Sequence, residues 1–352
     1  MGGSFGPTIT FARCRSISSA FSGTGRVTAI VLSATEAASI RRSRARGGYR
    51  RSMAARSPAR ATRRRVAVDS VAEHNQRMWD RLAAAGIPYT RPQGTPPNDA
   101  RAKRRFLDEL TFGRIKDIAL RGMRVLSLAG GGGWDPILFA ELGAETTLFD
   151  LSPKQLATVR ALAKERGTKL RVVQGDMRDL SRFKRSEFDL VYHHHSLVFV
   201  PDAARVIKEV ARVLAAGGMY VFSTMHPVTL RMYETWTGTG WGFKQRYFES
   251  SPVPRKSATW EFGDVRVEAP TLEYAHRFSD LVNACVRAKL VVDGLWEWSP
   301  NDEGGEPGSD DDLETYLPAY IAIRARRLPV AASIARRRAA ARSRPRSAKR
   351  SR

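Results

Sequence analysis

Short apolar runs and longer mixed segments alternate through the middle of the chain. The apolar runs predict five strands, and the mixed segments between them predict three helices. The strands are expected at residues 124–129, 145–151, 169–176, 188–195 and 219–225, and the helices at 134–143, 152–167 and 202–218. For the second helix, Ser152 is a suitable N-cap, Pro153 suits the first turn and Gly167 the C-terminus. This order predicts parallel βαβ units, which bind ligands at the carboxyl ends of their strands.

Four consecutive glycines, residues 130–133, follow the first predicted strand and therefore lie at that ligand-binding edge. Glycine adopts positive φ at little cost and lets a ligand approach the backbone. A dinucleotide-binding turn has the pattern G-x-G-x-x-G. Here Asp135, or Pro136 if the pattern is shifted by one, stands at the third glycine, and a carboxylate there repels a pyrophosphate. A plain tight turn remains the alternative.

Two acidic residues end the next two predicted strands. Asp150 ends the second strand, where an acid can accept hydrogen bonds from both ribose hydroxyls of an adenosine ligand. The segment "GDM" ends the third strand and places Asp176 to bind an adenine amino group, with Met177 packed on the ring. Ordinary capping or turn roles are the alternative for both acids.

Taken in order, these segments resemble the class I S-adenosylmethionine-dependent methyltransferases, particularly the group with small-molecule-type domains. The resemblance covers residues 125–223 through "VLSLAGGGG", "LFDLSPKQLATVRA", "VVQGDMRDL", "FDLVYHHHSLVFVPD" and "VIKEVARVLAAGGMYVFS". It implies an α/β, Rossmann-like fold with a central seven-stranded, mostly parallel sheet and helices on both faces. It also implies a reversed last strand near residues 319–324, an inserted lid or hairpin after strand five, and S-adenosyl-L-methionine as cofactor.

The resemblance also assigns roles to individual residues. The expected cofactor-binding residues are Ala129, Gly131, Gly133, Asp150, Asp176, Met177 and His193. Ser127 stands where the family usually has an acid, and Ala129 where it usually has a glycine. The acid that helps hold the cofactor's amino-acid end is therefore absent. Either Ser127 and a neighbour substitute for it through water, or cofactor affinity is weaker.

Methyl transfer from a sulfonium needs little covalent help, since placing the acceptor in line supplies much of the barrier reduction. A hydroxyl acceptor gains further from a general base. His195 and His226 are the candidates for that base, and the alternative is that these histidines contact the cofactor or shape the pocket. No metal site is expected, because no Cys/His cluster has zinc-ligand spacing. The aromatic-rich residues 227–271 suit either a lid over the acceptor or an added packed sheet.

The acceptor is expected to be a small molecule. The fourth strand is not followed by the Asn/Asp-Pro-Pro-aromatic segment of amino-group DNA methyltransferases, and the chain lacks the Pro-Cys nucleophile of cytosine-C5 enzymes. The alternative is a non-catalytic relative that binds nucleic acid or another anionic partner through basic tails. Nothing in the sequence predicts the oligomeric state.

Charge marks those tails. Of 59 Lys and Arg residues, 14 lie in residues 1–65 and 12 in residues 324–352, whereas only one of 35 acids lies in either segment. We expect a basic disordered extension at 1–65, which is alternatively a transit peptide or an artefact of a start codon assigned too far upstream, and a basic disordered tail at 327–352. The alternative to solvated tails is weak, nonspecific contact with nucleic acid. The methyltransferase domain is expected at 70–326, with cofactor binding at about 120–226.

No apolar run is long enough to predict a membrane span. Cys14 and Cys285 are the two cysteines, too few for a disulfide framework. The sequence therefore predicts a cytoplasmic protein.

Overall fold

The computed structural model describes residues 70–328, except 233, 234, 244, 254–258, 263 and 301–303. The predictions for residues 1–65 and for the tail beyond residue 328 lie outside the described residues. Within the described part, the elements begin at Ser70 and end at Arg327. The expected domain limits of 70 and 326 stay a prediction.

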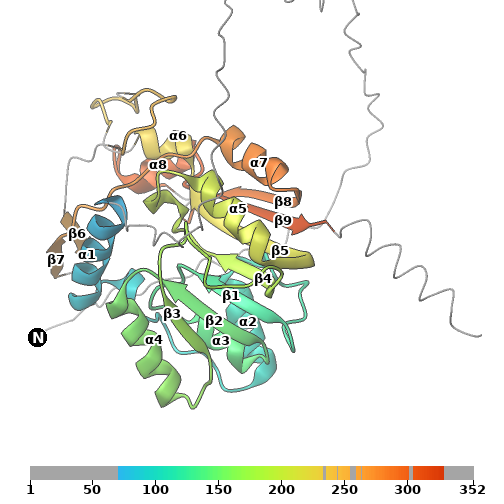
Figure 1. Ribbon diagram of the computed structural model, residues 1–352. Coiled ribbons are helices and arrows are strands. Elements are labelled where there is room, and N and C mark those ends of the chain that lie inside the picture. Colours follow the sequence, from blue (N-terminus) through green and yellow to red (C-terminus); the bar gives the residue numbers. More distant parts are fainter. Residues whose placement is uncertain are drawn as a thin grey trace, which may run out of the picture. The chain divides into compact units, whose positions relative to one another are not determined.

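A seven-stranded sheet forms the centre of the described domain (Figure 1). Its strands are β1 (Arg124–Leu128), β2 (Glu145–Asp150), β3 (Arg171–Gln174), β4 (Phe188–His193), β5 (Leu214–Met225), β8 (Leu290–Trp298) and β9 (Tyr320–Arg327). The order across the sheet is β3-β2-β1-β4-β5-β9-β8. Strands β1 to β5 pair in parallel, and β9 runs antiparallel to both of its neighbours. The predicted mostly parallel sheet with a reversed last strand is confirmed.

Helices connect and cover the strands. They are α1 (Ser70–Ala84), α2 (Ala100–Leu110), α3 (Asp135–Glu141), α4 (Pro153–Glu165), α5 (Ala203–Val213), α6 (Pro227–Met232), α7 (Phe278–Arg287) and α8 (Asp310–Tyr316), with short 3₁₀ turns η2 (Pro88–Thr90) and η3 (Leu197–Phe199). The predicted N-cap of α4 is confirmed, because the Ser152 side chain accepts from the Gln155 amide. The predicted end of α5 at residue 218 is wrong: α5 ends at Val213 and β5 begins at once.

The period-two alternation of the strands builds one core on each face of the sheet. Val125, Leu148 and Leu190 pack with residues of α3 and α4 on one face. Their strand neighbours, including Leu126 and Val191, pack with α5 and α7 on the other. Both faces of a mainly parallel sheet are thus covered, as such sheets require.

After β5, an antiparallel hairpin forms from β6 (Thr259–Phe262) and β7 (Val265–Glu268). Trp260 and Phe262 pack against Met78 and Leu82 of α1, in a small apolar cluster separate from the two main cores. The predicted hairpin after strand five is confirmed, whereas its role as a lid stays a prediction.

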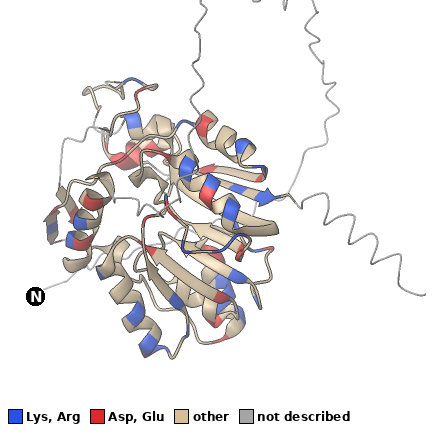
Figure 2. Ribbon diagram, in the orientation of Figure 1, with Lys and Arg blue, Asp and Glu red and all other residues tan. Residues whose placement is uncertain are grey.

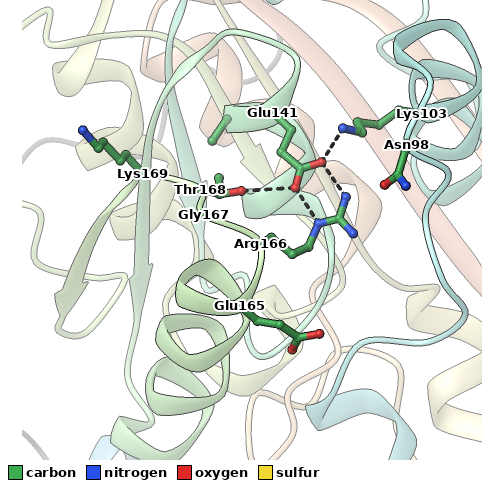
Figure 3. A pocket seen from close by; sticks show the side chains of 9 residues that line it. Asn98, Lys103, Glu141, Glu165, Arg166, Gly167, Thr168 and Lys169 are labelled. Atoms are coloured by element: carbon green, nitrogen blue, oxygen red, sulfur yellow. Dashed lines mark hydrogen bonds and ion pairs between the residues drawn. The ribbon is translucent and has the colours of Figure 1, made fainter.

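An ion-pair cluster joins α2, α3 and the end of α4 in an open groove (Figure 3). The Glu141 carboxylate lies 2.6 Å from Lys103 Nζ and 2.5 Å from Arg166 Nε, and it also accepts from the Thr168 hydroxyl at 3.1 Å. The Glu141 carboxylate is therefore neutralised and hydrogen-bonded by these three groups. We interpret the groove as a structural junction and not as a ligand site.

Charged residues of both signs are interspersed over the described helices and strands (Figure 2). Of the helices described, none combines the length and the apolarity that a membrane span needs.

Candidate functional site

A cavity of about 640 Å³ opens where the parallel strands end. This volume lies within the range of small-molecule sites, roughly 300–1,000 Å³. Its wall is formed by the glycine turn after β1, the ends of β2, β3 and β4, α1, the β6–β7 hairpin and residues of β8 and β9. Of the predicted site residues, Ala129, Gly131, Gly133, Asp150, Asp176, Met177 and His195 line it, whereas His193 and His226 do not.

The glycine turn is held by acceptors from the protein itself. The Gly131 amide donates to Asp150 Oδ2 at 2.9 Å, and the Gly132 amide donates to Gln155 Oε1 at 3.0 Å. A Cβ at Gly132 would lie 2.1 Å from the Thr90 carbonyl oxygen, so this glycine is needed for close approach of η2. A turn whose amides already donate to the protein is poorly suited to a pyrophosphate, which needs such donors.

Asp150 is fixed at the end of β2 by two backbone donors. Oδ1 accepts from the Ser152 amide at 2.8 Å and Oδ2 from the Gly131 amide. Burial raises its pKa to about 6, despite these hydrogen bonds. Because an ionised carboxylate has about four acceptor positions, Asp150 can still accept from a ligand's hydroxyl groups on the cavity side.

Asp176 forms an ion pair with the neighbouring Arg178. Its carboxylate accepts from the Arg178 side chain, with Nη2 at 2.6 Å, and from the Arg178 amide at 2.9 Å. Arg178 also lines the cavity. The ion pair fixes the direction of the Asp176 carboxylate beside Met177.

Ser127 lies fully buried beneath the glycine turn and does not line the cavity. Its hydroxyl donates to Asp135 Oδ2 at 2.7 Å. Asp135 does line the cavity, at the first position of α3. Burial, together with the charge of Asp150, raises the pKa of Asp135 to about 6.

The structure does not place His193, an expected cofactor-binding residue, in the cavity wall. His193 is the last residue of β4 and, like Val191, faces the α5 side of the sheet. It is fully buried, and its Nδ1 lies 2.8 Å from the Tyr220 hydroxyl. Strand alternation puts it on the face opposite Tyr192, away from the cavity.

The prediction that His226 is a general base is also not supported, because His226 lies outside the cavity lining. Its amide donates to the Ala319 carbonyl, and its Nε2 lies 3.2 Å from Glu297 Oε1 on β8. Burial lowers the pKa of His226, while Glu297 opposes that shift. This pairing links the start of α6 to β8.

His194 and His195 follow the strand and both line the cavity. His195 has φ +54°, so the backbone leaves the strand alternation there. Its amide donates to the Ser223 hydroxyl at 2.9 Å, and that hydroxyl lies 3.2 Å from His194 Nδ1. Burial lowers the pKa of His195 to about 4. Desolvation and the nearby His195 and Arg114 also lower the pKa of His194, although that residue is exposed at the cavity. Both rings are therefore neutral near pH 7.

Aromatic side chains form much of the remaining wall. They are Trp79, Tyr89, Phe112, Phe149, Phe199, Trp260, Phe262, Trp298 and Tyr320. Trp298 stacks on Tyr320 with ring centroids 5.2 Å apart, and the Arg114 guanidinium lies 3.7 Å from the centroid of Trp298. Beside His194 and His195, the cavity thus offers a flat apolar surface.

Helix α1, which lines this cavity, is held by hydrogen bonds from two of its residues. The Asn75 amide group donates to the Phe199 carbonyl and also exchanges hydrogen bonds with the backbone of Leu272. Further along α1, Asp80 accepts from the Ser152 hydroxyl at 2.6 Å. These bonds connect α1 to η3, to the chain after the hairpin and to the N-terminus of α4.

The charge of the lining suits a cation better than a phosphate. Asp135 and Asp150 lie in the wall, and no described basic side chain forms an ion pair with either. Arg178, the basic residue of the lining, pairs with Asp176. A sulfonium cofactor carries positive charge and ribose hydroxyls, so the residues present fit it.

A protein-family model described as a methyltransferase domain matches residues 126–222. The chain is also similar to the uncharacterized methyltransferase YbaJ of Bacillus subtilis (strain 168), at 27% identity over 263 residues, covering 73% of this chain and 98% of that protein. The chain therefore contains an S-adenosylmethionine-dependent methyltransferase domain with the class I sheet. Its cofactor is S-adenosylmethionine.

Other similarities cover less of the chain. A ubiquinone biosynthesis O-methyltransferase of Xanthomonas euvesicatoria pv. vesicatoria (strain 85-10) is 32% identical over 109 residues. The match covers 31% of this chain and 46% of that protein. The crystal structure of an S-adenosylmethionine dependent methyltransferase from Mesorhizobium loti has 26% identity and a TM-score of 0.47, covering 63% of this chain and all of that one.

Several lining residues of the methyltransferase escaped sequence reasoning. Gln155, His194 and Asp135 are examples. Asp135 carried a usable signal, since it is an acid two residues after the glycine run, at the expected start of a helix. Phe112, Trp298 and Tyr320 carried none, because they are distant in sequence and meet only in the fold.

Proposed function

We propose that this methyltransferase transfers the methyl group to a hydroxyl of a small, planar acceptor. The observation that carries the proposal is that one cavity joins an acidic end, at the glycine turn, to an aromatic end beside His194 and His195. Two ligands that must react with each other need such a shared, water-excluding space. The O-methyltransferase relative, though under half of it is covered, supports oxygen as the first acceptor atom to test.

In this proposal Asp150 binds the ribose hydroxyls, and Asp176 with Met177 binds the adenine. The turn from Ala129 to Gly133 lies along the ribose and the methionine part. Ala129 supports this role through its φ of +49°, which turns the backbone sharply after β1. His193 and His226 have no role in the proposed site.

Bound S-adenosylmethionine supplies a methyl group already activated by its sulfonium. The chain's own residues then have to hold the acceptor oxygen in line and keep water out. The aromatic wall binds the acceptor ring by its faces. The rings of His194 and His195, whose pKa values are lowered, are neutral near pH 7 and can accept or donate a hydrogen bond at the acceptor hydroxyl. The proton of the acceptor hydroxyl passes to solvent, so placement contributes more than proton removal by a side chain.

The test uses full-length protein and methyl-labelled S-adenosylmethionine with fractionated metabolite extracts. We expect label in extractable phenols or other planar hydroxyl compounds. A Phe112→Ala variant should raise KM for that acceptor and leave S-adenosylhomocysteine affinity unchanged. Phe112 is 52% exposed, so the substitution removes little core packing. Label found solely in precipitated protein or nucleic acid would refute the small-molecule acceptor.

A further inference from the structure

The first strand of the sheet ends at Ser127 and Leu128 without an acid, yet a carboxylate is present beside that strand end. Asp135 comes from the start of α3, eight residues further along the chain than Ser127. Its Oδ2 accepts from the Ser127 hydroxyl, which is fully buried and fixes the direction of the carboxylate. Its Oδ1 lies 3.2 Å from the position that a Cβ would occupy at Gly133. The carboxylate therefore lies directly against the glycine turn.

Burial makes the charge of Asp135 costly unless a cation approaches it. Burial and Asp150 both raise the pKa of Asp135, and no described basic side chain pairs with it. Asp150 differs, because two backbone amides already donate to it and it remains suited to neutral hydroxyls. Asp135 accepts from the Ser127 hydroxyl and from its own backbone amide but has no described cationic partner. The complementary ligand group is therefore a cation that carries N–H donors.

S-adenosylmethionine has one such group, its α-ammonium, since the sulfonium has no N–H. We infer that Asp135, oriented by Ser127, binds the α-ammonium group of the cofactor and replaces the acid missing from the end of β1. Ser127 is a positioning residue, and Asp135 is a binding residue. This inference rests on the proposed cofactor site.

The test compares three ligands by titration calorimetry on the full chain. S-adenosylhomocysteine has the ammonium and the carboxylate, its decarboxylated analogue keeps only the ammonium, and 5′-methylthioadenosine has neither. Asp135→Asn should weaken the first two by about 10- to 100-fold, the loss of one charge-assisted hydrogen bond, and change the third less than about twofold. Ser127→Ala should weaken the same two ligands by a smaller factor.

Binding of 5′-methylthioadenosine also reports that the variant is folded, because this ligand shares the adenosine part. Asp150→Asn is the matched comparison, a carboxylate in the same cavity that should weaken all three ligands alike. If Asp135→Asn gave that same uniform loss, or no loss at all, the role of Asp135 would be overturned. A wild-type protein that bound none of the three would overturn the proposed cofactor site itself.

Discussion

The ion-pair cluster at Glu141 predicts how the stability of the fold depends on pH. Burial would raise the pKa of Glu141, but Arg166 and Lys103 outweigh it and lower the pKa from 4.5 to about 2. A carboxylate with a lowered folded-state pKa stabilises the fold above its unfolded-state pKa. That contribution is lost as pH falls through the folded-state pKa. The stabilisation is therefore complete above about pH 4.5 and disappears towards pH 2.

The shift sets an upper bound of about 3 kcal/mol, at about 1.36 kcal/mol per pKa unit. Screening in the open groove reduces the expected contribution to about 1–2 kcal/mol. Glu141→Gln should lower the free energy of unfolding in urea by that amount at pH 7. The difference from wild type should shrink as pH falls below about 4.5, because the wild-type carboxylate also becomes neutral.

The matched control is Glu165→Gln. Glu165 lines the same groove, is exposed, and projects away from Glu141 (Figure 3). We expect the free energy of unfolding of the Glu165→Gln variant to stay within about 0.5 kcal/mol of the wild-type value. A Glu141→Gln deficit that stayed constant from pH 7 to about pH 3 would show that the residue acts through packing and not through its charge.

Three further predictions concern the site and the domain limits. Asp150→Asn should weaken S-adenosylhomocysteine about 10- to 100-fold by calorimetry, since one charge-assisted hydrogen bond contributes about 1.5–3 kcal/mol; unchanged affinity would remove Asp150 from the site. Because burial lowers the pKa of His195 to about 4, wild-type turnover should show no histidine titration between about pH 6 and 9. A rise through that range that vanishes in His195→Gln would contradict this. A fragment of residues 66–328 should match the full chain in Tm and S-adenosylhomocysteine affinity and should lose salt-dependent retention on heparin. Loss of cofactor binding would place necessary structure in the tails.

The sequence predicted the half of the site that depends on local signals. Alternating strands, the Ser152 cap and the glycine run each leave a pattern within about ten residues. Asp150 then follows from its place at a strand end, and the structure puts it in the cavity wall. These features were predictable because parallel strands align their carboxyl ends whatever the rest of the chain does.

The aromatic half of the cavity was not predictable in the same way. Phe112 precedes the first strand, whereas Trp298 and Tyr320 belong to β8 and β9. They meet because β9 inserts between β5 and β8, which is a property of sheet order and not of any local pattern. The end of β4 posed a similar problem. Whether His193 or His194 faces the cavity depends on which residue makes the last strand pairing, and His193 makes it with Phe222.

That single register decides what the histidines can do. With His193 paired at the end of β4, its ring is buried against Tyr220, and His194 and His195 take the cavity wall. The lowered pKa of each ring moves it away from the operating pH, where the pKa of a general base should lie. Both remain able to orient an acceptor through neutral hydrogen bonds. A methyl group that arrives already activated requires no more than this, and the aromatic surface opposite supplies the remaining alignment.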